Sequence, residues 1–159
     1  MKPDQKFLFS HPAHFIAFGF GSGLVKKAPG TIGTLVAIPL YAALVWLTPP
    51  LVTGLVIVLL FAVGVWASAI AGKTLGVADH GGIVIDEIVA FMLVLLFTPK
   101  TMVWWIAAFL LFRLFDIFKP WPISLADQKI KGGFGVMFDD LLAAIFSIGC
   151  IVTAQSMQY

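Results

Sequence analysis

The chain has 159 residues, of which 60% are hydrophobic and only 11% are charged, and its mean hydropathy is +1.03. Soluble domains contain about 45–50% apolar and about 25% charged residues, so this apolar excess is too large for one globular core to bury. The net charge is only +2 and no basic run occurs, which excludes a conventional nucleic-acid-binding surface. The composition therefore predicts one membrane-embedded domain over residues 1–159, with membrane lipid as its surroundings.

Five apolar segments follow one another along the chain, separated by breaks rich in Gly, Thr and Pro. They cover residues 33–47, 51–71, 83–97, 102–118 and 136–154. A membrane-spanning helix needs about 20 residues, and backbone polar groups cannot stay unpaired in lipid, so we expect helices throughout. The predicted fold is an all-α integral membrane helical bundle. It has about five membrane helices plus a short N-terminal interfacial helix within residues 7–20.

The lysines indicate the orientation of such a bundle. If all five segments span, Lys100 alone lies in the loops on one side, and eight lysines lie on the other side. Those eight are Lys2, Lys6, Lys26, Lys27, Lys73, Lys119, Lys129 and Lys131. Positive charge marks the cytoplasmic side, which predicts a multi-pass protein with its N-terminus inside. Every acidic residue maps to the same side, although no acidic residue was used to derive the orientation.

Two adjacent acidic pairs lie near the starts of apolar segments, Asp86-Glu87 in the third and Asp139-Asp140 in the fifth. A charge inside a membrane segment costs about 2.5–3.5 kcal/mol, and clustered carboxylates repel unless protons or a cation offset them. Mg²⁺ accepts carboxylates, waters and substrate phosphate oxygens as ligands. These four carboxylates therefore predict a Mg²⁺ site where the helices meet.

A structural explanation stays open for each pair. Asp139-Asp140 could cap the N-terminus of the fifth segment, where negative charge is favourable. Asp86-Glu87 follows residues 81–85, which places it a turn inside the third segment, so capping explains this pair less well.

Basic and hydroxyl side chains on the same side indicate an anionic ligand. Arg113 and Lys119 lie near the end of the fourth segment, and residues 30–34 form a small-residue turn that leads into the first segment. Such a turn can present N–H groups and hydroxyls to phosphate, although Gly and Thr also mark ordinary helix starts. Arg113 could instead pair only with Asp116, three residues further along the helix. The candidate phosphate ligands are Lys26, Thr31, Thr34, Arg113 and Lys119.

Five ordered motifs extend across residues 21–140. They are GSG at 21–23, APGTIGT at 28–34, IDE at 85–87, FRLFDIFKP at 112–120, and GG followed by VMFDD within 132–140. Their order resembles the phosphatidylglycerophosphatase A family of bacterial membrane lipid phosphatases. The resemblance implies hydrolysis of phosphatidylglycerophosphate to phosphatidylglycerol and phosphate with Mg²⁺. It also implies a place in phospholipid synthesis at the bacterial inner membrane.

The residues and the resemblance together give a mechanistic hypothesis. Mg²⁺ among the acidic pairs polarises the phosphoryl group or activates water, while Lys26, Arg113 and Lys119 neutralise the phosphate. An aspartyl nucleophile is the open alternative. The hypothesis assigns catalytic roles to Asp86, Glu87, Asp116, Asp139 and Asp140.

The rival function is a proton- or ion-coupled carrier, because intramembrane carboxylates also mark transport pathways. The absence of acids on the opposite side argues against a carrier.

Overall fold

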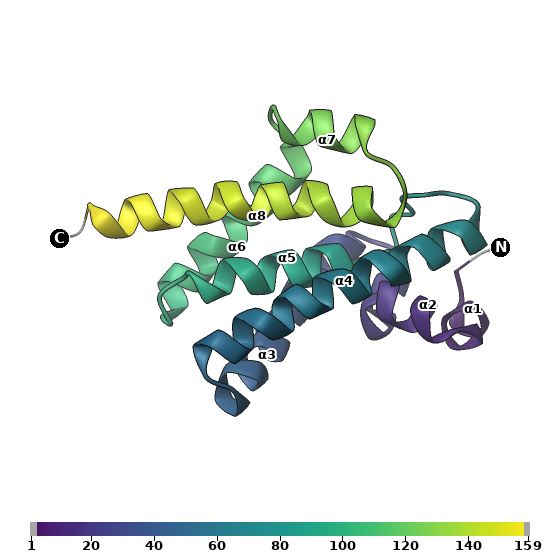
Figure 1. Cartoon of the computed structure of the whole chain (residues 1–159), viewed down its shortest axis with the longest axis horizontal. Helices are drawn as coiled ribbons and strands as arrows, with labels where there is room; N and C mark the ends of the chain where they lie inside the picture. The colour runs from purple at the N-terminus through teal and green to yellow at the C-terminus, as the bar shows by residue number, and fades with distance from the viewer. Residues whose placement is uncertain (1–2, 158–159) are drawn as a thin grey trace.

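A computed structural model describes residues 3–157, and within this range the secondary structure is helical, without a strand (Figure 1). The elements are α1 (Gln5–Ser10), α2 (Pro12–Ala17), the 3-10 helix η1 (Gly19–Leu24), α3 (Pro29–Leu47), α4 (Pro50–Leu75), α5 (Ile85–Leu96), α6 (Met102–Phe118), α7 (Ile123–Lys129) and α8 (Gly132–Ser156). Each of the five predicted apolar segments corresponds to one of the helices α3 to α6 and α8, which confirms the all-α fold.

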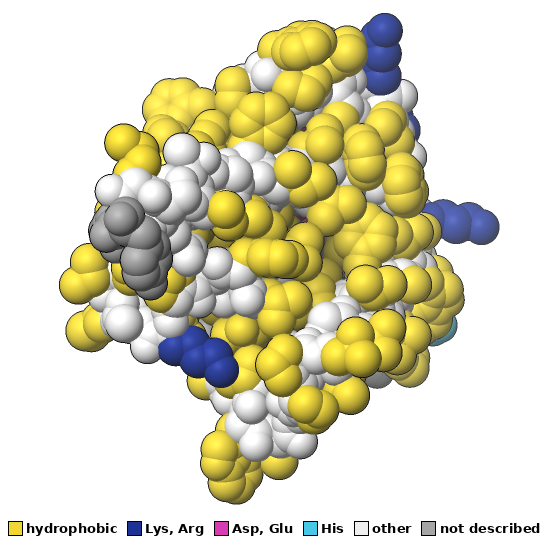
Figure 2. All heavy atoms as spheres, turned by 60° about the vertical axis from the view of Figure 1, so that its left-hand side comes forward, with side chains coloured by type: hydrophobic (Ala, Val, Ile, Leu, Met, Phe, Trp, Pro, Cys, Tyr) yellow, Lys and Arg dark blue, Asp and Glu magenta, His cyan; other side chains and the backbone are white. Residues whose placement is uncertain are grey.

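Three of these helices, α3, α4 and α8, are long and apolar enough to cross a membrane. Hydrophobic side chains cover most of the face shown in Figure 2, as expected for a surface in contact with lipid. Helix α5 has only 12 residues. At 1.5 Å per residue it rises about 18 Å, well short of a hydrocarbon core of about 30 Å. Residues 3–157 therefore contain three helices of spanning length, as expected for a helical membrane protein.

Helix α5 lies at the centre of the bundle and packs against α3, α4, α6 and α8 (Figure 1). Nine of its 12 residues are buried, from Ile85 to Leu95. A short helix with irregular backbone at its ends is tolerated at membrane depth where other protein segments cover it. The surrounding helices supply that cover, so the polar N-terminal end of α5 lies inside protein.

The N-terminal segment forms two short α-helices and η1, whereas the sequence predicted one short helix. His11 separates the two α-helices: its Nδ1 accepts a hydrogen bond from the Ala13 N–H and caps α2. Helix α2 packs on α4, where the buried His14 ring bonds to the Thr74 hydroxyl at 3.1 Å. The segment also reaches the approach to α5, since the Val84 N–H donates to the Ala17 carbonyl at 2.9 Å. The N-terminal segment is thus a fixed part of the bundle.

Close contact between α4 and α8 sets the position of the last helix. A Cβ atom on Gly133 would lie 2.1 Å from the Val65 carbonyl oxygen and 2.6 Å from the Ala69 nitrogen. Only glycine permits this approach, which brings the first turn of α8 against the α4 backbone. Helix α8 also packs on α5, and this contact carries its acidic residues toward the N-terminal end of α5.

Candidate functional site

Three carboxylates from two helices converge at the N-terminal end of α5. One oxygen each from Asp86, Glu87 and Asp140 lies within 4.8 Å of the others. Asp86 and Asp140 are 7% and 2% exposed. Each of the three side chains has a buried oxygen without a hydrogen-bond partner among residues 3–157. We call these residues the carboxylate triad. Buried anions without partners are costly, so the triad has the chemistry of a cation-binding site.

The two acidic pairs occupy different positions in their helices. Helix α5 begins at Ile85, so Asp86 and Glu87 lie in its first turn, where the helix dipole favours negative charge. The expectation that this pair lies a turn inside the helix was wrong. Helix α8 begins at Gly132, about two turns before Asp140. Capping therefore does not explain the α8 pair, and a buried mid-helix carboxylate needs another partner.

Arg113 on α6 connects three helices at the triad. It forms an ion pair with Asp116, and its Nη1 lies 3.9 Å from Glu87 Oε1 on α5. The same nitrogen donates to the Thr34 hydroxyl on α3 at 3.4 Å, while its Nε is buried without a partner within the described range. The pairing of Arg113 with Asp116 occurs, but Arg113 is not confined to it.

Lys119 pairs with two further carboxylates next to the triad. It follows the last residue of α6 with φ +43°, and its ammonium group pairs with Asp127 at 2.8 Å and with Asp139. Burial favours the neutral amine, but the two carboxylates outweigh it and raise the pKa of Lys119 well above its usual value. The structure thus divides the α8 pair: Asp140 joins the triad, and Asp139 binds Lys119.

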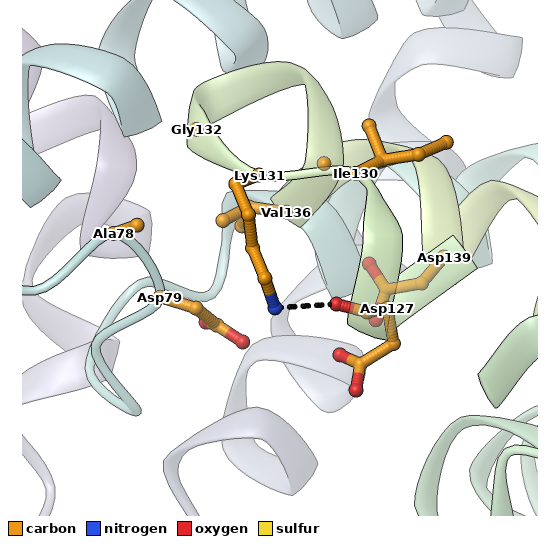
Figure 3. Close-up of a pocket in the computed structure, with 9 residues that line it drawn as sticks. Ala78, Asp79, Asp127, Ile130, Lys131, Gly132, Val136 and Asp139 are labelled. Carbon is orange, nitrogen blue, oxygen red and sulfur yellow. Dashed lines mark hydrogen bonds between the residues drawn. The ribbon is translucent and has the colours of Figure 1, made fainter. Parts of the chain in front are cut away.

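A small cleft opens beside Asp139, between the α4–α5 loop and the α7–α8 connection (Figure 3). Asp79, Asp127, Lys131 and Asp139 supply its polar lining. Lys131 Nζ donates to the main-chain carbonyl oxygen of Asp127 at 2.8 Å.

Helix α7, which carries Asp127, was missed by the sequence analysis. The signal for it was the short ISLADQK stretch directly after Pro122, since proline is common at helix starts.

The remaining candidate phosphate ligands lie at the start of α3 or before it. Lys26 is exposed, and Thr31 is half-buried; neither side chain has an ion pair or hydrogen bond within the described part of the chain. Thr34 is buried, and its hydroxyl donates to the Gly30 carbonyl at 2.8 Å while it accepts from Arg113. Of these three residues, the structure brings Thr34 alone into contact with the charged cluster, as a support for Arg113.

Taken together, the apolar helices and the buried acidic and basic groups define a helical membrane protein with a polar site compatible with a divalent cation. A family model described as phosphatidylglycerophosphatase A matches residues 15–155. The chain belongs to this family. The family predicted from the five motifs is confirmed, and so is the prediction that the chain is a phosphatase.

Curated relatives match over most of their length. A phosphatidylglycerophosphatase A of Escherichia coli is 41% identical over 89% of this chain and 83% of its own. The Haemophilus influenzae protein of the same name is 42% identical over 96% and 94%. A Bacteroides thetaiotaomicron relative, 40% identical over 88% and 91%, is provisionally named a phosphatidylinositol-3-phosphatase. No solved structure matches the chain.

Gly30, at the start of α3, offers a test of the triad that changes no charge. A Cβ atom here would lie 2.1 Å from Glu87 Oε1 and 3.3 Å from Arg113 Nη1. We expect Gly30→Ala to fold normally, because alanine favours helix and the obstructed group is the end of a flexible side chain. Displacement of the Glu87 carboxylate should lower phosphatase activity by about 10–100-fold.

Activity and the thermal unfolding midpoint should be measured together for this variant. The matched control is Gly54→Ala in α4, where a Cβ would meet only Leu96 Cδ2 at an ordinary 3.7 Å. Equal activity in the two variants would show that the position of Glu87 is unimportant.

Proposed function

We propose that this chain hydrolyses phosphatidylglycerophosphate to phosphatidylglycerol and phosphate in a Mg²⁺-dependent reaction. The names of the Escherichia coli and Haemophilus influenzae relatives support the substrate. The observation that carries the metal dependence is the carboxylate triad, with its three buried oxygens that lack partners among the described residues. Water supplies the atoms that complete the phosphate and the alcohol, so no further co-reactant is needed.

The triad fits Mg²⁺ by its chemistry. Magnesium takes oxygen ligands and combines a few carboxylates with waters and substrate phosphate oxygens. The triad and Asp116 bring four formal negative charges together, and among the described residues Arg113 is the cation that forms ion pairs with this group, through Glu87 and Asp116. A divalent cation would offset most of the excess negative charge. When bound, Mg²⁺ would polarise the phosphoryl group or lower the pKa of a water.

The basic residues have distinct roles in this proposal. Arg113 donates to the substrate phosphate and stabilises the charge that builds up in the transition state; its unpartnered Nε–H supports this role. Lys119 stays protonated through its two carboxylate partners and adds positive potential next to the triad. Asp139, which the sequence assigned to the metal, holds Lys119 in place. Asp86, Glu87 and Asp140 would hold the ion.

We place the site at the cytoplasmic face of the bacterial inner membrane, in a single domain over residues 1–159. The loop lysines support this orientation, in a five-helix arrangement whose short α5 is enclosed by the neighbouring helices. Pulling acyl chains out of a bilayer costs about 0.8 kcal/mol per methylene group. The substrate therefore keeps its chains in the membrane and presents only its headgroup to the triad.

The direct test uses detergent-purified protein with phosphatidylglycerophosphate, assayed for phosphate release with Mg²⁺ and with excess chelator. We expect release with the metal and a fall to background without it. Release unchanged by the chelator would remove the metal from the proposal. Ion flux in protein-containing vesicles, without phosphate release under any condition, would instead support the rival carrier.

A further inference from the structure

Helices α3 and α6 both pack on α5 and leave a groove between them. Leu35 and Ile38 of α3 form one wall, and Met102, Trp105, Ile106 and Phe109 of α6 form the other. The groove has a volume of about 520 Å³, within the usual range of about 300–1,000 Å³ for small-molecule sites. Behind the lining, the buried Tyr41 ring of α3 packs edge-on against Trp105, with centroids 6.1 Å apart. The groove is therefore a defined, mostly apolar site in which one lining residue, Trp105, packs against the buried Tyr41.

The groove approaches the charged cluster along both helices. Leu35 directly follows Thr34, and Phe109 lies one helical turn before Arg113 on the same face of α6. The hydrogen bond between Arg113 and the Thr34 hydroxyl joins α3 to α6 at this end. The apolar lining of the groove thus begins within one helical turn of Arg113. Polar lining returns at the opposite end, with Lys100 and Thr101.

The groove extends along α6 from its first turn toward Arg113. Its lining on α6 runs from Met102 to Phe109, which is about 10 Å along a helix. Arg113 lies one turn further on, so Arg113 and Met102 are 11 residues, or about 16 Å, apart. An acyl chain whose headgroup reached Arg113 would therefore cover the apolar wall of α6 down to its start.

We propose that this groove binds one acyl chain of the phospholipid substrate while the headgroup phosphate reaches Arg113 and the triad. The inference rests on the proposed function. The lipid enters sideways from the bilayer between α3 and α6, and its chain never leaves an apolar environment. The fit of the chain then contributes to substrate affinity, so the enzyme discriminates between lipid phosphates by their chains as well as by their headgroups.

The test fills the groove with Ile106→Trp and, from the other wall, Ile38→Trp. The matched control is Leu110→Trp, a lipid-facing position on α6 outside the groove; Leu110 is 61% and Ile106 53% exposed. Each purified variant is assayed on long-chain phosphatidylglycerophosphate and on a short-chain, water-soluble analogue. We expect both groove variants to raise KM for the long-chain substrate by about tenfold. The effect on the short-chain analogue should be several-fold smaller, and Leu110→Trp should resemble the parent on both substrates.

The other outcomes each contradict the proposal in a recognisable way. Groove variants that treat both substrates as the parent does would show that the groove holds no substrate chain. Equal losses on both substrates would show a distorted site. A changed oligomeric state of the groove variants in size-exclusion chromatography would identify a second copy as the occupant. If the parent protein hydrolyses neither substrate, the proposed function fails first, and the acyl-chain site fails with it.

Discussion

Asp86→Asn and Asp140→Asn should each reduce Mg²⁺-dependent phosphate release by about 10³-fold or more. Each change removes one carboxylate of the triad, in which three oxygens lie within 4.8 Å of one another. A bound metal stabilises transition-state charge by several kcal/mol, and each 1.36 kcal/mol corresponds to tenfold in rate. Steady-state rates on the lipid substrate, measured over a range of Mg²⁺ concentrations, check this expectation.

The same two variants should be more stable than the parent when no metal is present. Removing one negative charge from a buried acidic cluster lessens its repulsion and desolvation cost, so the thermal unfolding midpoint without metal should rise. Addition of Mg²⁺ should stabilise the parent, because a ligand that binds the folded state shifts unfolding, and should stabilise the variants less.

Asp79→Asn is the matched control for charge, since Asp79 is an exposed loop acid at the same end of the bundle and outside the triad. Its activity and its response to Mg²⁺ should be close to those of the parent. Full Mg²⁺-dependent activity in either triad variant would rule out the triad as the metal site.

Replacement of Arg113 by glutamine should lower both activity and stability. The change leaves Glu87 and Asp116 without their shared cation, and breaking a buried ion pair costs about 3–5 kcal/mol. Loss of one donor to a developing charge lowers kcat by about 10²–10³-fold. Thermal unfolding and kinetics on the same preparation measure both effects.

Arg113→Lys separates the two roles of this side chain. Lysine restores the charge but lacks the planar guanidinium group, whose Nη1 contacts Thr34, Glu87 and Asp116 and which carries further N–H donors. We expect most of the stability to return and the activity to stay at least tenfold below the parent. Lys73→Gln, which removes an exposed cation from α4, should change neither property greatly. Normal activity in Arg113→Lys would mean that charge alone suffices at this position.

The sequence was sufficient to predict the helices and the convergence of the acidic groups. Hydrophobic runs determine helices in an apolar protein, because every backbone group in lipid must pair within its own segment. The antiparallel order of those runs then places Asp86, Arg113 and Asp140 at the same end of the bundle. The triad and Arg113 come from three segments that the sequence analysis had already singled out.

The details that failed depend on helix boundaries and on packing between helices. Apolar residues before Ile85 made the third segment look longer than α5, so the place of Asp86 and Glu87 in the first turn was missed. Adjacent residues on a helix point about 100° apart, since a turn contains 3.6 residues. Asp139 and Asp140 therefore face different neighbours, and adjacency in sequence did not indicate a shared ligand. The close approach of Gly30 to Glu87 requires the crossing of α3 and α5 in three dimensions.

The burial of α5 by four neighbours has a consequence for how the protein is assembled during synthesis. A 12-residue helix with two acidic residues in its first turn is a poor substrate for independent insertion into a bilayer. Its carboxylates gain their cover and their third partner, Asp140, only when α8 packs against it, and α8 is the last helix of the described chain. Until then the acidic end of α5 lacks its enclosure. Completion of the carboxylate triad is thus coupled to completion of the bundle, so partly synthesised chains would hold an incomplete triad.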